Sequence, residues 1–221
     1  MPDANAVHPL AVGSAVESMK HTIAEGWIYP VFFLSGFAAL LYQVIWQRTL
    51  LTLYGTNVES VAIVVTAFLL GLGLGSVAGG ALSKIPGCSP LGLFCVAELG
   101  IGCFGLVSLG LFHWVGKFTL ELSIWGTSVT ALSLVLFPTL FMGGTLPLLT
   151  AHAVASNGNV GRSVGLLYFI NTFGSALASI AAATFLLRAM GLQKTTWLAA
   201  LLNLISAAIS AFFVFRSGVR R

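Results

Sequence analysis

A nearly uninterrupted run of apolar sequence from Trp27 to Phe215 is the feature that most limits how this chain can fold. Only ten basic and six acidic residues occur among 221, and charged residues make up 7 % of the chain, whereas a soluble domain carries roughly a quarter. The first apolar stretch, residues 27–53, has a single charge at Arg48 and exceeds the ~20 residues that cross a bilayer as a helix. A chain with so few charges cannot cover itself with a soluble surface. The sequence therefore predicts an integral membrane protein in direct contact with the lipid bilayer.

Apolar runs separated by charges and turn residues predict six membrane-spanning helices. These spans are residues 28–53, 60–83, 91–115, 127–154, 164–190 and 195–215. We expect an all-α bundle in one membrane domain, residues 27–215, because a helix satisfies its own backbone hydrogen bonds in lipid. The connection at residues 113–126 carries aromatic residues at near-helical spacing, and this pattern predicts an interfacial helix.

Both ends of the chain are predicted to lie on one side of the membrane, since an even number of crossings returns the chain to its starting side. Six Lys and Arg residues fall on that side and four on the other, which favours the cytoplasm for both termini and the inner, cytoplasmic membrane as the location. Residues 1–26 lack the pattern of a cleaved signal, and either a short amphipathic interfacial helix or a disordered tail fits them. Residues 216–221 are expected to form a basic cytoplasmic tail.

Glycine patterns within the spans imitate a nucleotide-binding motif but predict helix packing. Residues 100–105 match the dinucleotide fingerprint, yet they lie inside a span with no preceding strand. Small residues repeated every four positions instead let two membrane helices approach closely. The residues predicted to pack in this way are Gly71, Gly75, Gly79, Gly174 and Ala178. The histidines and cysteines show no ligand spacing and the basic residues are scattered, so we expect no metal, no cofactor, no catalytic residues and no nucleic-acid partner.

Four polar residues are predicted to form a small pocket that faces the cytoplasm. Glu98 lies ~12 Å into the third span at 1.5 Å per residue, where a carboxylate costs about 2.5–3.5 kcal/mol unless it finds a partner. Asn171 lies at a similar depth in the fifth span, and Thr145 and Tyr168 fall in the same third of the membrane, beside a predicted helix break at residues 143–147. Two interpretations stay open: a cation, proton or substrate pocket centred on Glu98, or a Glu98–Asn171 hydrogen bond that only sets packing.

Arg48 is the only charged residue of the first span. It lies ~30 Å along the helix from the inner face at 1.5 Å per residue, too far to pair with Glu98. We expect its side chain to reach the outer boundary of the membrane or to meet Glu59.

Four stretches form an ordered series with a recognisable pattern. They are residues 33–48 (FLSGFAALLYQVIWQR), 67–76 (AFLLGLGLGS), 142–147 (MGGTLP) and 161–174 (GRSVGLLYFINTFG). Together they resemble the membrane-embedded spermidine synthase-like proteins, over nearly all of residues 33–213. The resemblance implies the fold of half of a major facilitator superfamily transporter, commonly joined to a cytoplasmic aminopropyltransferase domain that uses decarboxylated S-adenosylmethionine and putrescine. Glu98 matches the family pattern, whereas Gln43 stands where the family often has glutamate and Arg188 where it often has proline.

Three functions are compatible with the sequence. No soluble catalytic domain is predicted in this chain, so we do not expect it to be an enzyme alone, and the resemblance favours a non-catalytic module that anchors or regulates a separate soluble aminopropyltransferase in polyamine metabolism. A homodimeric transporter of polyamines or another small cation is the first alternative, because six spans are half the usual facilitator count. The second is a structural subunit of a larger membrane complex, whose small-residue faces meet other chains.

Overall fold

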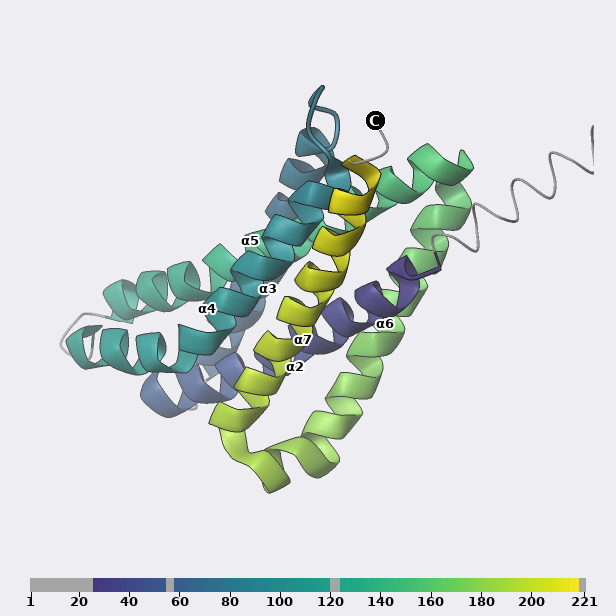
Figure 1. Cartoon of the computed structure of the whole chain (residues 1–221). Helices are drawn as coiled ribbons and strands as arrows, with labels where there is room; N and C mark the ends of the chain where they lie inside the picture. The colour runs from purple at the N-terminus through teal and green to yellow at the C-terminus, as the bar shows by residue number, and fades with distance from the viewer. Residues whose placement is uncertain (1–25, 55–57, 120–123, 219–221) are drawn as a thin grey trace, which may run out of the picture.

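The apolar segments fold as helices throughout the part of the chain that the structure describes. The computed structural model describes residues 26–54, 58–119 and 124–218, in which helices alternate with short turns and no strand occurs (Figure 1). The elements are α2 (Ile28–Tyr54), α3 (Val58–Leu82), α4 (Pro90–Thr119), α5 (Ile124–Asn157), α6 (Val160–Ala181), the π-helix η1 (Ala182–Leu186) and α7 (Leu187–Gly218). The predicted all-α class is confirmed over these residues.

Within the described residues, five helical stretches are long and apolar enough to cross a membrane. They are Ile28–Leu53, Val64–Leu82, Pro90–Thr119, Gly126–Asn157 and Val160–Arg216. Such a set fits a multi-pass membrane protein, because apolar residues surround each helix and only lipid or other helices can cover them. The last stretch, 57 residues long, differs from the others in length. At 1.5 Å per residue it would extend ~85 Å if straight, almost three times the ~30 Å hydrocarbon core.

The long C-terminal stretch is not straight. Gly191 has φ 72° and ψ 176°, which are not helical values, and glycine alone adopts this conformation without steric cost. Figure 1 shows the chain reversing here, so that α6 (green) and α7 (yellow) run in opposite directions. The reversal falls between the predicted spans at residues 164–190 and 195–215.

The predicted break at residues 143–147 is wrong. Helix α5 continues from Ile124 to Asn157 with Pro138 and Pro147 inside it. Prolines within a membrane helix are tolerated where neighbouring helices and polar side chains accommodate the disturbed backbone. The paired glycines of this segment serve instead to bring α5 close to α3.

The predicted interfacial helix at residues 113–126 is also not formed as a separate element over its described residues. Residues 113–119 are the last two turns of α4, which begins at Pro90, and no proline interrupts that helix after its first residue. Residues 120–123 lie outside the described residues. Trp114 and Phe118 are nevertheless more than half exposed, as expected for aromatic side chains near a membrane boundary.

The helices pack in a pattern that repeats within the chain. The most extensive contacts join α3 to α5, α4 to α7 and α2 to α6, followed by α4 with α5 and α2 with α7. When α2, α3 and α4 are exchanged for α5, α6 and α7 in that order, α3/α5 becomes α2/α6 and α4/α5 becomes α2/α7, while α4/α7 stays the same pair. The contact between α2 and α4 breaks the pattern, since α5 and α7 have no contact of similar extent among the described residues.

Aromatic side chains fill the centre of the bundle. Trp46 of α2 is fully buried, stacks on Tyr42 with ring centroids 4.7 Å apart, and meets Phe104 and Phe112 of α4 edge to face. The indole nitrogen of Trp46 donates a 3.0 Å hydrogen bond to the Ser108 hydroxyl, so its polar atom is also satisfied. This cluster fixes the side of α2 that faces α4 and thereby positions the polar residues beside it.

Candidate functional site

Glu98 is fully buried where α2, α4 and α7 meet. Its Oε1 accepts a hydrogen bond of 2.5 Å from the Ser35 hydroxyl of α2, and its Oε2 accepts one of 2.7 Å from Asn203 Nδ2 of α7. Hydrogen bonds are strengthened in such a low-dielectric interior. One carboxyl group of α4 therefore links three helices.

The partners of Glu98 are neutral. In the described part of the chain its two oxygens are bonded by a hydroxyl and an amide, and neither brings a compensating positive charge. Hydrogen bonds to a charged group contribute about 1.5–3 kcal/mol each. They offset the cost of placing a carboxylate in the membrane, which is of the same order on insertion scales, about 2.5–3.5 kcal/mol.

Two polar atoms beside this carboxyl group have no partner. Asn203 Oδ1 and the Tyr42 hydroxyl are buried and have no hydrogen-bond partner among the residues that the structure describes. Tyr42 follows Ser35 by two helical turns, and its ring rests on Gly105, which follows Glu98 by two turns; a Cβ added to Gly105 would lie 2.6 Å from Tyr42 Cζ. An unpaired buried polar atom costs about 1–3 kcal/mol, so both atoms offer hydrogen bonds to a small polar guest such as water.

The structure does not bring the four predicted pocket residues together around Glu98. The Asn171 carbonyl and side chain lie instead against Gly36 of α2, where a Cβ would come 2.9 Å from the Asn171 carbonyl carbon. Thr145 is buried on α5 and donates to the Met142 carbonyl at 2.7 Å, within its own helix. Tyr168 on α6 is 60 % exposed and faces out of the bundle. The predicted hydrogen bond between Glu98 and Asn171 is also not formed, because the amide that bonds Glu98 is that of Asn203.

Sequence reasoning missed two of the three residues in this junction. Asn203 is the only amide side chain in the predicted span 195–215, and the depth argument applied to Asn171 would have singled it out as well. Ser35 carried no signal, because single serines are common in membrane helices and pack as small residues. Which helices share an interface cannot be read from apolar periodicity when every face is apolar.

The small residues predicted for packing lie at helix contacts. Gly75 faces the backbone of Leu140, and a Cβ on Gly79 would lie 2.7 Å from the Cα of Gly144, so α3 and α5 touch backbone to backbone. Gly71 in the same stripe faces the side chain of Thr139. On α6, Gly174 lies against the Phe33 carbonyl of α2, and Ala178 is fully buried.

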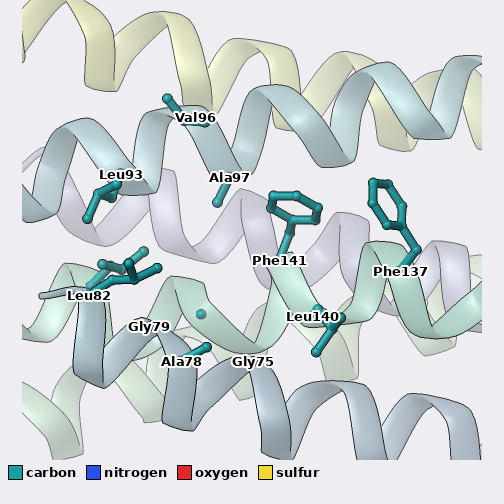
Figure 2. Close-up of a pocket in the computed structure, with 12 residues that line it drawn as sticks. Gly75, Ala78, Gly79, Leu82, Leu93, Val96, Ala97, Phe137, Leu140 and Phe141 are labelled. Carbon is teal, nitrogen blue, oxygen red and sulfur yellow. The ribbon is translucent and has the colours of Figure 1, made fainter.

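A side cavity of about 330 Å³ lies between α3, α4 and α5 (Figure 2). Its walls are apolar. Figure 2 shows Phe141 of α5 beside Ala97 of α4, and Leu93 of α4 toward Leu82 of α3, with Ala78 and Leu140 on the α3 and α5 sides. Glu98 does not line it, although its neighbour Ala97 does. This cavity suits hydrocarbon and offers no ligand for a cation.

A metal ion would find few ligands in the described residues. No three His, Cys, Asp or Glu side chains lie together there, and Glu98 is the only acidic residue whose side chain is described. A single carboxyl group with neutral oxygens around it suits a proton, a water molecule or a monovalent ion better than a divalent metal.

Comparison of this chain with protein-family models, curated proteins and solved structures finds no match. The fold class and the geometry around Glu98 are therefore the observations on which a function is proposed.

Proposed function

We propose that this chain is a non-catalytic membrane module with the architecture of half a facilitator, which anchors or regulates a separate soluble aminopropyltransferase. In this proposal the chain crosses the inner membrane six times, because the stretch Val160–Arg216 reverses at Gly191 and crosses twice. Both termini then lie in the cytoplasm. The observation that carries the architecture is the repeated packing pattern of the helices.

That pattern is the one expected from an inverted repeat. Facilitator halves consist of two three-helix units of opposite membrane orientation. In this chain the pairs α3/α5 and α2/α6 exchange with one another when the first three helices are exchanged for the last three, and both are close contacts at glycines. Each unit would cross the membrane three times. Because three is an odd number, the second unit would begin on the opposite side from the first and so have the opposite orientation.

The distribution of charge supports an anchoring role over a transport role. The described acidic side chain, Glu98, is sealed from solvent and bonded, whereas the described basic side chains are exposed and lie near helix ends. Three of them, Lys84, Arg162 and Arg216, fall at the proposed cytoplasmic side. A basic rim at the membrane surface suits contact with an acidic face of a soluble protein. The identity of that protein as an aminopropyltransferase rests on the sequence resemblance.

Gentle detergent extraction of the tagged chain, followed by mass spectrometry of co-purifying proteins, tests this function. We expect an aminopropyltransferase in near-stoichiometric amount, and its loss when Lys84 and Arg162 are both changed to Glu. The matched control is Lys117→Glu, an exposed base at the proposed outer side. Recovery of the chain only with itself would contradict the anchor proposal.

A homodimeric transporter of a small cation is the second candidate. It is favoured by the unpaired Tyr42 hydroxyl and Asn203 Oδ1 beside the buried carboxyl group, since transporter sites lie at the membrane midplane between repeats. For this candidate Glu98→Gln abolishes uptake of the cation into proteoliposomes without changing the amount of folded protein. Unchanged uptake in Glu98→Gln would remove Glu98 from the transport route.

The structural-subunit alternative is not favoured by the packing of the described helices. It relied on the small-residue faces of α3 and α6 meeting other chains. Both faces are occupied by helices of this same chain, α5 for the stripe at Gly75 and α2 for the stripe at Gly174.

A further inference from the structure

We propose that a basic cavity beside the α6–α7 reversal binds a phosphate group, supplied by the headgroup of an anionic phospholipid. The cavity has a volume of about 500 Å³ and is lined by Arg48, Leu51 and Thr52 of α2 and by Leu187, Gly191 and Leu192 at the reversal. It is separate from Glu98 and is not needed for the anchoring role. Its position at a membrane boundary follows from Arg48 lying near the end of a 27-residue helix.

Arg48 supplies the charge of this cavity. Its side chain is exposed, and among the residues whose side chains the structure describes the only carboxylate is that of Glu98, which is bonded by Ser35 and Asn203. The expected pairing of Arg48 with Glu59 involves a side chain outside the described set. An exposed guanidinium with no acidic partner among the described side chains presents planar N–H donors that match phosphate oxygens in pairs.

Two further basic residues lie close in sequence to residues that line the cavity. Arg188 adjoins the lining residue Leu187, and Lys194 follows the lining residue Leu192 by two positions; both are exposed. Basic pockets between membrane helices are typical binding sites for anionic headgroups. Arg48 is the one charged residue among those that line the cavity.

The walls of the cavity match a lipid rather than a free ion. Its sides are apolar and lie next to the guanidinium, being formed by Leu51, Leu187 and Leu192. A phospholipid has a matching arrangement, with an apolar acyl chain next to a charged phosphate. Gly191 holds the wall open, because its positive φ turns the chain away from the helix axis at that point. A leucine-lined cavity with one cationic end would be poorly filled by inorganic phosphate alone.

Native mass spectrometry of the purified full chain with phosphatidylglycerol, phosphatidylcholine or inorganic phosphate tests the proposal. We expect the wild-type chain to retain one more phosphatidylglycerol than phosphatidylcholine, and Arg48→Gln to lose that difference. Lys117→Gln, an exposed base that does not line the cavity, should keep it. Retention of phosphatidylglycerol that is unaffected by excess inorganic phosphate identifies the lipid as the source.

Displacement of phosphatidylglycerol by inorganic phosphate would overturn the lipid as the source and assign the site to a soluble anion. Equal lipid retention by wild-type chain and Arg48→Gln would overturn the site itself. Because a change at Arg48 could disturb folding, Arg48→Lys serves as a second variant. It keeps the charge and should retain part of the difference, whereas full loss with an unchanged circular dichroism spectrum would contradict a charge-based site.

Discussion

The α3/α5 interface and the α2/α4/α7 junction are both buried, yet they are built from opposite kinds of residue. At α3/α5, glycines bring two backbones together, with Gly75 against Leu140 and Gly143 against Leu72. At α2/α4/α7, large aromatic rings and a bonded carboxyl group fill a wider space. The first contact tolerates no added atom, whereas the second depends on particular hydrogen bonds.

The two interfaces also differ in their relation to the repeated packing pattern of the helices. The glycine contact at α3/α5 has a counterpart at α2/α6, where Gly36 and Gly174 are the close points. The polar junction has none, because it includes the α2/α4 contact that breaks the repeated pattern. The repeated helix contacts determine the general packing of the bundle. Glu98 and its partners lie outside this pattern, and they distinguish the first three helices from the last three.

The largest effect is expected from a side chain inserted at α3/α5. Gly143→Ala places a Cβ against the Leu72 carbonyl oxygen and 2.8 Å from its carbonyl carbon, and neither backbone can move without separating the helices. We expect a loss of about 3 kcal/mol of folding free energy, at the upper end for overpacking, seen as a lower thermal midpoint in detergent. Gly73→Ala is the matched control, since a Cβ there meets nothing within 4 Å. Equal effects of the two changes would contradict close backbone packing.

A smaller but still large effect is expected at Glu98. Glu98→Ala leaves the Ser35 hydroxyl and the Asn203 amide without their acceptor, at a cost of about 1–3 kcal/mol. Glu98→Gln keeps one acceptor oxygen and should lose less. Thermal unfolding of both variants measures the difference. The junction would not be stabilised by these bonds if Glu98→Ala melted at the wild-type temperature.

Much of the fold could be predicted because composition alone determines that the chain must be helical in lipid. The reversal near Gly191 was also accessible, since charges and turn residues mark the ends of spans, and an acidic residue inside an apolar span was expected to find hydrogen-bond partners, as Glu98 does. The partners Ser35 and Asn203 were not accessible, because they depend on which helices are neighbours. The break predicted at residues 143–147 failed for the same reason: glycines next to proline weaken a helix alone but serve close packing once α3 lies beside them.

Loss of the Trp46 indole hydrogen bond at the junction should lower the free energy of unfolding by a modest amount. Trp46→Phe removes the 3.0 Å bond to Ser108 and leaves that hydroxyl bonded to the Gly105 carbonyl. We expect a loss of about 1 kcal/mol from the bond, with some added loss from the smaller ring. The double variant with Ser108→Ala should cost little more than Trp46→Phe alone. Full additivity of the two changes would show that the pair is not coupled.

The smallest effect is expected at Tyr42. Its hydroxyl is buried and no described residue bonds it, so Tyr42→Phe removes an unsatisfied group and should leave the thermal midpoint unchanged or slightly higher. A loss of more than about 1 kcal/mol would mean that the hydroxyl bonds a guest, such as water or a cation, in the membrane. This change therefore separates a sealed packing junction from an occupied site.

The proposed six-crossing arrangement depends on the reversal of the long C-terminal stretch at Gly191. Single-cysteine labelling in intact cells tests it most directly, with Cys88, Cys95 and Cys103 replaced by serine and one cysteine placed at Gln193 or at Arg216. The account predicts that a membrane-impermeant maleimide labels the cysteine at position 193 from outside the cell and reaches the one at position 216 only after permeabilisation. Labelling of both positions from the same side would contradict the six-crossing arrangement.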